Sequence, residues 1–117
     1  MAKIAVVEDN DAMREQLCGF IAQYARESGR QLDVTAFADG AEIVDPYRPG
    51  FDIIFLDIEM PTLGGMPTAE RIRQVDPDVV LVFVTNMAQY AIRGYEVDAL
   101  DFVLKPVSYY QFSTKLD

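Results

Sequence analysis

Residues 51–65, FDIIFLDIEMPTLGG, contain the feature around which the fold is organised. Four consecutive apolar residues, Ile53 to Leu56, lead directly into the carboxylate of Asp57. An apolar run without polar alternation is typical of a strand that is buried on both faces. Pro61 cannot donate a hydrogen bond to a neighbouring strand, so the strand has ended before it. The pattern therefore places Asp57 at the carboxyl end of a central strand, where open α/β sheets bind their ligands.

The rest of the sequence alternates strand-like apolar segments with helix-like amphipathic segments. Strands are expected at residues 4–7, 32–37, 52–56, 79–84 and 101–104. Helices are expected to follow them, from a cap at Asn10 or Asp11 to Gly29, from Asp39-Gly40 to Pro46, from Gly64-Gly65 to Pro77, from about Met87 to Gly94, and from Ser108 onward. Five strand–helix pairs predict one α/β domain with a parallel sheet, helices on both of its faces and right-handed crossovers.

Polar side chains that can carry chemistry follow four of the five predicted strands. They are Glu8 and Asp9 after the first strand, Asp57 after the third, Thr85 after the fourth and Lys105 after the fifth. Because the carboxyl ends of parallel strands meet at one edge of a sheet, we expect three carboxylates, a hydroxyl and an ammonium group to converge there.

This set of groups favours a hard divalent cation and phosphoryl transfer. Crowded carboxylates repel one another, and a cation such as Mg²⁺ with oxygen ligands relieves that repulsion. Asp57 is then a candidate nucleophile that forms an acyl phosphate, because a carboxylate needs no separate base at neutral pH. The metal and Lys105 would neutralise charge on the transferring phosphoryl oxygens, and the Thr85 hydroxyl would donate to one of them.

Composition narrows the classes of function. The 117 residues include 19 acidic and 10 basic side chains, and the net charge of −9 argues against this domain binding nucleic acid itself. The absence of histidine excludes imidazole metal sites and histidine-based acid–base chemistry. The single cysteine, Cys18, cannot form an internal disulfide. No segment has the length of a membrane span or the features of a signal peptide, so we expect a cytoplasmic domain without membrane contact.

These motifs resemble the receiver domains of bacterial two-component response regulators. The resemblance covers essentially the whole chain and rests on Glu8-Asp9, on LDIEMPTLGG with Asp57, on VTN with Thr85, and on DFVLKP with Lys105-Pro106. It implies a single receiver domain over residues 1–117, with a flavodoxin-like (βα)5 doubly wound parallel sheet of strand order 2-1-3-4-5. It also implies a signalling domain and not an enzyme.

The resemblance implies a role for each residue of the predicted site. Asp57 accepts a phosphoryl group from a phosphohistidine of a sensor histidine kinase. Mg²⁺ is held by the side chains of Asp9 and Asp57 and by the backbone carbonyl of Glu59, with Glu8 acting mainly through water. Lys105 pairs with the phosphoryl group.

A conformational switch is implied as well. Thr85 moves toward the phosphoryl group and, with the aromatic Phe102, relays the change to the face formed by the predicted helix at 87–94, the strand at 101–104 and the last helix. The resemblance also implies a cis peptide bond between Lys105 and Pro106.

The last predicted helix carries three aromatic residues, Tyr109, Tyr110 and Phe112, within four positions. On one helix they cannot all face the core. We therefore hypothesise that one or more of them contribute to a homodimer contact or an interdomain contact on the same face.

Local sequence points to a subgroup of the family. DIEMP, together with Tyr90-Ala91 and Ala99-Leu100-Asp101-Phe102, resembles the LytR/AlgR subgroup. Members of that subgroup usually carry a LytTR-type DNA-binding output domain after the receiver, and no such domain is present here. We expect the chain to be a piece of a longer regulator of an output such as transcription, with a natural single-domain receiver as the alternative.

Two positions depart from the commoner family pattern. Glu8 stands where Asp is more usual, and Asn86 follows Thr85 where a small residue is more usual. We hypothesise that Glu59, Asn86 and Met87 line the path of the hydrolytic water and set the lifetime of the phosphoryl group.

Two other functions are compatible with this set of residues. Haloacid-dehalogenase-type phosphatases also use an Asp nucleophile, a Thr or Ser, a Lys and Mg²⁺, but their nucleophile usually follows the first strand in a D-x-D pattern. Asp57 instead follows the third predicted strand, as D-x-E. A degenerate, receiver-like interaction module would bind its partner without phosphate, and the complete set of site residues argues against it.

Overall fold

The computed structural model describes residues 2–86 and 101–116, without the side chains of Asp101 and Phe102. The predicted helix at 87–94, which includes Met87, therefore lies outside the described residues. The side chain of Phe102, on which the expected switch depends, lies outside them as well. Among the described helices, none combines the length and the apolar character that crossing a membrane requires.

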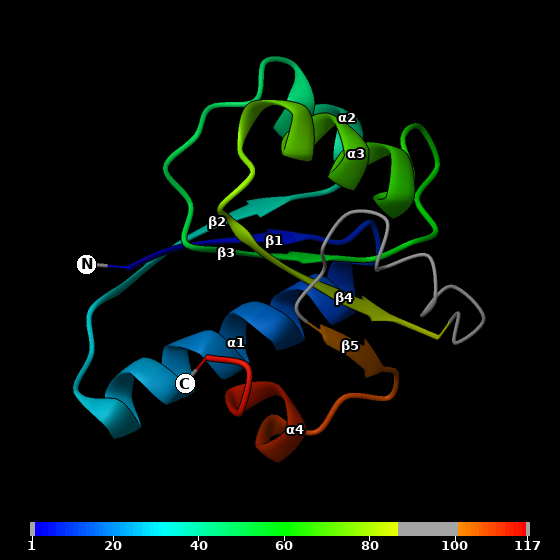
Figure 1. Ribbon diagram of the computed structural model, residues 1–117. Helices are drawn as coiled ribbons and strands as arrows, with labels where there is room; N and C mark the ends of the chain where they lie inside the picture. Colours follow the sequence, from blue (N-terminus) through cyan, green and yellow to red (C-terminus); the bar gives the residue numbers. More distant parts are fainter. Residues whose placement is uncertain (1, 87–100, 117) are drawn as a thin grey trace.

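The centre of the fold is a five-stranded parallel sheet (Figure 1). Its strands are β1 (Ala2–Val7), β2 (Leu32–Phe37), β3 (Ile53–Leu56), β4 (Val80–Thr85) and β5 (Asp101–Leu104). The order across the sheet is β2-β1-β3-β4-β5, which confirms the predicted flavodoxin-like topology. The edge strand β2 alternates between half-buried and exposed residues, whereas the central strands are almost wholly buried, as their continuous apolar sequences predict.

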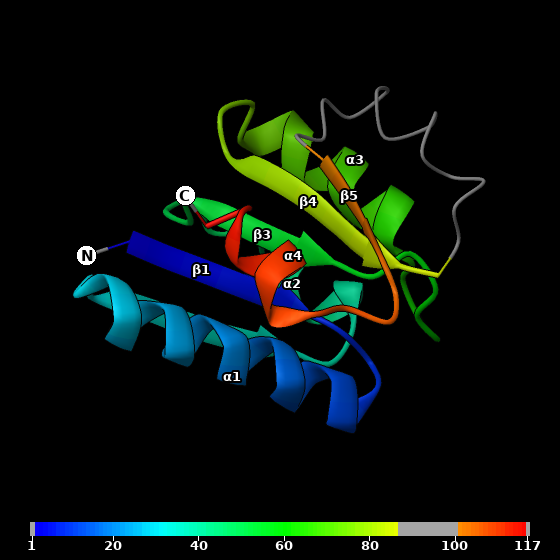
Figure 2. The same cartoon turned by 90° about the horizontal axis from the view of Figure 1, so that it is seen from below.

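Helices cover both faces of the sheet. They are α1 (Asp11–Ser28), α2 (Gly40–Val44), α3 (Gly65–Val75) and α4 (Tyr109–Ser113). Helices α2 and α3 lie above the sheet in Figure 1 and α1 and α4 lie below it. Figure 2 views the molecule from the side of α1 and α4. Each face has its own apolar core, and the α1/α4 core includes Phe55 and Phe112, whose ring centroids are 4.5 Å apart.

Helix ends follow the signals in the sequence. The Asn10 side chain accepts a hydrogen bond from the Met13 amide, 2.9 Å away, and Gly29 ends α1 in the left-handed conformation with φ of 73°. Ser108 caps α4 by accepting from the Gln111 amide at 3.2 Å. These contacts confirm both predicted starts and the predicted stop.

The end of α3 is tied to the following turn by an arginine side chain. Arg73 lies in the last turn of α3, and its Nη1 donates to the carbonyl oxygens of Asp76, Pro77 and Val79 at 3.2, 3.2 and 2.6 Å. The guanidinium group therefore binds the turn that leads into β4. The helix period identifies the outward face but not the carbonyl groups beyond the helix end.

Candidate functional site

The parallel register brings the polar residues after β1 and β3 together. Val7 pairs with Leu56, so Glu8 and Asp57 leave the sheet side by side. The Asp57 amide donates to the Val7 carbonyl at 3.0 Å, which extends the ladder by one bond beyond the strands. On the other side of the sheet centre, Thr85 pairs with Leu104, and the Lys105 amide donates to the Thr85 carbonyl at 2.9 Å. Backbone pairing therefore fixes the positions from which the side chains converge.

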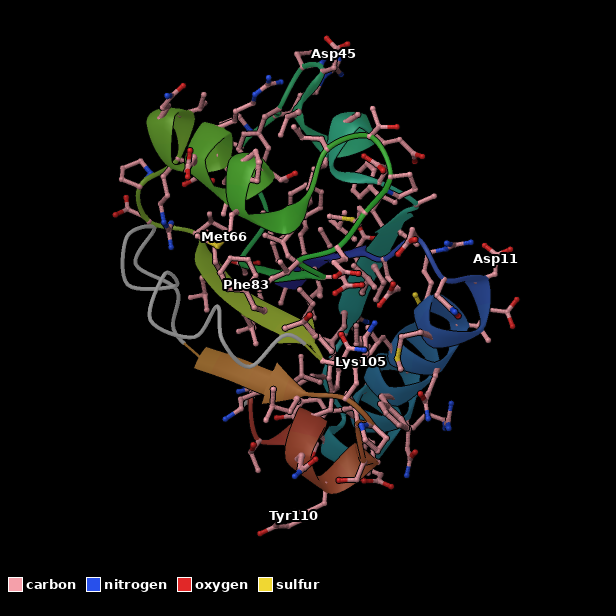
Figure 3. All side chains as sticks on the ribbon, turned by 90° about the vertical axis from the view of Figure 1, so that its right-hand side faces the viewer. Asp11, Asp45, Met66, Phe83, Lys105 and Tyr110 are labelled. Atoms are coloured by element: carbon pink, nitrogen blue, oxygen red, sulfur yellow. The ribbon has the colours of Figure 1, made fainter. Side chains whose placement is uncertain are left out.

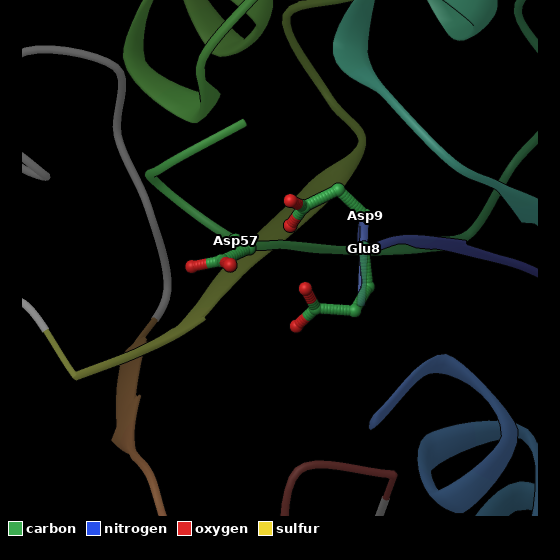
Figure 4. Close-up of side chains that lie close together, drawn as sticks. All are labelled: Glu8, Asp9 and Asp57. Carbon is green, nitrogen blue, oxygen red and sulfur yellow. The ribbon is translucent and has the colours of Figure 1, made fainter. Parts of the chain in front are cut away.

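Three carboxylates form one cluster at this edge (Figure 4). One oxygen each from Glu8, Asp9 and Asp57 lies within 4.8 Å of the others. Glu8 is 1% exposed and Asp57 7%, whereas Asp9 is exposed to solvent. Oxygen donors this close, with one open side, fit a hard divalent cation that keeps several waters.

Lys105 supplies the positive charge of the site. Its Nζ donates to Glu8 Oε1 at 2.7 Å and to Asp57 Oδ2 at 3.2 Å. Figure 3 shows Lys105 at the end of β5, among the side chains at this edge of the sheet. Burial alone would lower the pKa of Lys105, but the hydrogen bond to Glu8 and the charges of Asp57 and Glu8 outweigh it and raise that pKa above its usual value.

Glu8 has an unusual proton affinity. Burial raises its pKa from 4.5 to about 7, against the opposing effects of hydrogen bonds from Lys105 and from the Asn10 amide. The nearby Asp57 charge also contributes to this increase in the pKa of Glu8. A proton and a divalent cation are therefore expected to compete for this carboxylate.

The first loop of the site is held by Arg14, which the sequence analysis did not identify. Its Nη1 donates to the Glu8 carbonyl at 2.8 Å, and its Nη2 pairs with the Asp11 carboxylate. One guanidinium group thus joins helix α1 to the segment that carries Glu8 and Asp9. In the sequence, Arg14 is recognisable only as a basic residue in the first turn of the helix that follows Glu8 and Asp9. Such a position is too common to indicate a specific role.

Gly65 is required by a close approach of two backbones. A Cβ at this position would collide with the Asp57 carbonyl oxygen and come within 2.9 Å of the Ile58 Cα. The Gly65 amide donates to the Ile58 carbonyl at 2.8 Å. The N-terminus of α3 is therefore packed directly against the residue pair that follows β3.

The other predicted site residues have these positions in the structure. Thr85 is fully buried at the end of β4, while Glu59 and Asn86 are exposed just beyond their strands. The peptide bond between Lys105 and Pro106 is cis. Backbone pairing and side-chain contacts thus bring Glu8, Asp9, Asp57 and Lys105 together and place Thr85 at the same edge.

Comparison with known proteins identifies the kind of domain to which this geometry belongs. The family model described as response regulator receiver domain matches residues 4–117. The sensory transduction protein LytT of Bacillus cereus is 32% identical over 108 residues, which cover 91% of this chain and 42% of that protein. The transcriptional regulatory protein YpdB of Escherichia coli is 30% identical over 106 residues, which cover 89% of this chain and 41% of that protein. The chain thus spans less than half the length of these curated relatives.

Solved structures give the same result. The non-phosphorylated HemR receiver domain from Leptospira biflexa has a TM-score of 0.85 and 29% identity, covering 99% of this chain and 91% of that one. The response regulator TrrA from Thermotoga maritima, solved in complex with Mg²⁺-BeF, has a TM-score of 0.80 and 25% identity, covering 99% of this chain and 96% of that one. The similarity to LytT also confirms the subgroup resemblance seen in the sequence. The chain belongs to the response regulator receiver domains.

Proposed function

We propose that this chain is a phosphoacceptor domain in which Asp57 takes a phosphoryl group from a sensor histidine kinase in a Mg²⁺-dependent reaction. The observation that carries the proposal is the convergence of three carboxylates, with oxygens within 4.8 Å of one another. The Lys105 ammonium group forms ion pairs with two of them, Glu8 and Asp57. As a response regulator receiver domain, the chain is a signalling domain and not a catalytic enzyme.

In the proposed reaction, the Asp57 carboxylate attacks the phosphorus of a phosphohistidine. An oxygen–phosphorus bond forms while the phosphorus–nitrogen bond breaks, and the electron pair of that bond stays on the leaving imidazole. Lys105 Nζ, now shared between Glu8 and Asp57, turns to a phosphoryl oxygen and stabilises its charge. Mg²⁺, when bound, supplies further positive charge against the phosphoryl oxygens.

The donor set for that cation is the acidic cluster. We assign the side chains of Asp9 and Asp57 and the backbone carbonyl of Glu59 as its ligands, with Glu8 acting mainly through water. Carboxylate and carbonyl oxygens are the donors that Mg²⁺ prefers. The structure of TrrA in complex with Mg²⁺-BeF supports a Mg²⁺ site in this chain by similarity.

The signalling step is a proposal that follows from the same site. Thr85 and Phe102 are expected to relay phosphorylation to the face formed by residues 87–94, β5 and α4. Glu59, Asn86 and Met87 are expected to line the path of the hydrolytic water. Output through a further domain of LytTR type, which would bind DNA and control transcription, and a cytoplasmic location complete the proposal. The length of the curated relatives supports a longer parent protein.

The test is the intact mass after incubation with Mg²⁺ and acetyl phosphate, with Asp57→Asn as the control. We expect the wild type to gain the mass of one phosphoryl group only when Mg²⁺ is present, and the variant to gain none. A wild type that gains no phosphoryl group and binds no beryllofluoride would instead support the phosphate-independent interaction module. Steady release of phosphate from a general phosphomonoester would support the phosphatase alternative.

A further inference from the structure

A second buried carboxylate, Asp39, lies outside the acidic cluster. It precedes α2 and is 8% exposed. Its Oδ1 accepts from the Ala41 amide at 2.9 Å, which makes it the N-cap of α2. The same oxygen accepts from the Leu63 amide at 2.8 Å, and Oδ2 accepts from the Thr62 amide at 2.9 Å. Capping uses one of these three bonds, and the other two reach a segment 23 and 24 residues further along the chain.

That segment is the β3–α3 loop, residues 57–64, which carries the phosphoacceptor. Its ends are fixed by the sheet and by α3, because the Asp57 amide donates to Val7 and the Gly65 amide donates to Ile58. Asp39 holds the loop between these ends. Thr62 is three residues after Glu59, so at most roughly 10 Å of chain separates Thr62 from the Glu59 carbonyl, and a shift of Thr62 can reach that carbonyl through the backbone.

A second observation shows that the start of α2 packs directly against this loop. A Cβ on Gly40 would lie 2.5 Å from the Leu63 carbonyl oxygen and would collide with Thr68 Oγ1. Thr68 Oγ1 in turn donates to the Gly64 carbonyl at 2.8 Å. The start of α2, the second half of the loop and the first turn of α3 thus form one buried polar junction.

The charge of Asp39 suits this role. Burial opposes ionisation, but the three amide donors outweigh it and lower the pKa of the carboxyl group below its usual value. Both oxygens of Asp39 therefore remain hydrogen-bond acceptors throughout the neutral pH range, unlike those of Glu8 in the acidic cluster.

We propose that Asp39 is a positioning residue that fixes the β3–α3 loop so that the Glu59 carbonyl faces the acidic cluster, and that it thereby couples α2 to cation binding. The inference rests on the proposed function, since it assigns that carbonyl to Mg²⁺. Outer residues that orient metal ligands typically change affinity by about 10- to 100-fold when they are replaced.

The variant that tests the proposal is Asp39→Asn. Asparagine is as good an N-cap as aspartate, so the start of α2 is kept. With the remaining oxygen in the place of Oδ1, which accepts from Ala41 and Leu63, the amide nitrogen replaces Oδ2 and cannot accept from the Thr62 amide. We expect the dissociation constant for Mg²⁺, measured by calorimetry, to rise about 10-fold or more.

The matched control is Asp76→Asn, which makes the same change in charge at the opposite end of α3. Asp76 Oδ1 accepts from the Val79 amide at 3.2 Å and Oδ2 accepts from the Tyr47 hydroxyl at 2.8 Å, so it also joins two loops. We expect this variant to lower the melting temperature but to change Mg²⁺ affinity less than about twofold. Equal losses of affinity in the two variants would show a general effect of charge or stability and would overturn the proposal.

Hydrogen exchange of the wild type gives a readout that needs no variant. Because coupling is reciprocal, Mg²⁺ should slow exchange of the Ala41 amide in α2 together with the Thr62 and Leu63 amides. Unchanged Ala41 exchange in a protein that binds Mg²⁺ would overturn the coupling and leave the proposed function intact. A wild type that binds no Mg²⁺ would overturn the proposed metal site itself. Calorimetry on the wild type detects this outcome directly and so separates it from a failure of the coupling alone.

Discussion

Among single residues, Glu8 has the environment that most affects how the site responds to pH. Its pKa is raised from 4.5 to about 7, so the folded metal-free protein holds the proton more tightly than the unfolded chain does. The contribution of Glu8 to stability is therefore fully present below about pH 4.5 and is lost as the pH rises through 7. A shift of this size corresponds to a free energy on the order of 3 kcal/mol.

We predict that Glu8→Gln removes this part of the pH dependence. Glutamine keeps the shape of the side chain but does not titrate. Urea unfolding of both proteins in EDTA at pH 5 and pH 8 measures the pH dependence of the free energy of unfolding. The free energy of unfolding of the wild type should fall between these pH values relative to that of the variant. Parallel pH profiles for the two proteins would contradict the prediction.

Addition of Mg²⁺ provides the complementary measurement. A proton on Glu8 competes with the cation, so Mg²⁺ should raise the melting temperature more at pH 8 than at pH 5.5. Chelation with EDTA should reverse the gain. An equal gain at both pH values would show that Glu8 does not titrate with metal binding.

At the scale of elements, the junction between β3 and α3 combines the phosphoacceptor with a helix start that has no room for a side chain. We predict that Gly65→Ala destabilises the protein by about 1–3 kcal/mol, because the added methyl group collides with the Asp57 carbonyl. The displaced Asp57 should also accept phosphoryl groups more slowly from acetyl phosphate. Urea unfolding and intact mass measure the two effects.

Gly19 in α1 offers the matched control. Nothing lies within 4 Å of the Cβ that alanine would add there, and the residue is in a helix interior. Gly19→Ala should therefore stabilise the protein by about 0.5–1 kcal/mol and leave phosphorylation unchanged. A loss of stability in Gly19→Ala similar to that in Gly65→Ala would mean that the collision is not the cause.

The distance in sequence between interacting residues explains how much of the structure was predictable from sequence. The strand Ile53–Leu56 follows from its continuous apolar run, although its hydrogen-bond partners lie far away in sequence on β1 and β4. Helix ends such as Asn10 and Gly29 follow from local patterns, because their hydrogen-bond partners are close in sequence. The convergence of the acidic cluster was predictable because parallel strands share one edge. The bonds of Asp39 to the β3–α3 loop were not, since their partners lie 23 and 24 residues away and no periodicity specifies them.

For the whole molecule, the surface of β5 and α4 determines whether two copies can associate. Of the three aromatic residues in α4, Phe112 is buried against Phe55, and Tyr109 donates to Glu27 at 2.8 Å. Tyr110 is 79% exposed and points away from the molecule (Figure 3), and Leu104 on β5 is 49% exposed. The homodimer proposal therefore depends on Tyr110 and Leu104.

We predict that loading with beryllofluoride and Mg²⁺ promotes self-association through this surface. Two copies with a net charge of −9 repel each other, so association should strengthen as salt screens that repulsion. Sedimentation equilibrium should give a mass that approaches twice that of the monomer for the loaded wild type, and Tyr110→Ser or Leu104→Ser should remain monomeric. Val75→Ser is the control, because Val75 is 55% exposed on α3 and should not affect the mass. A monomer in both the free and the loaded state would rule out the dimer and leave Tyr110 available for an interdomain contact.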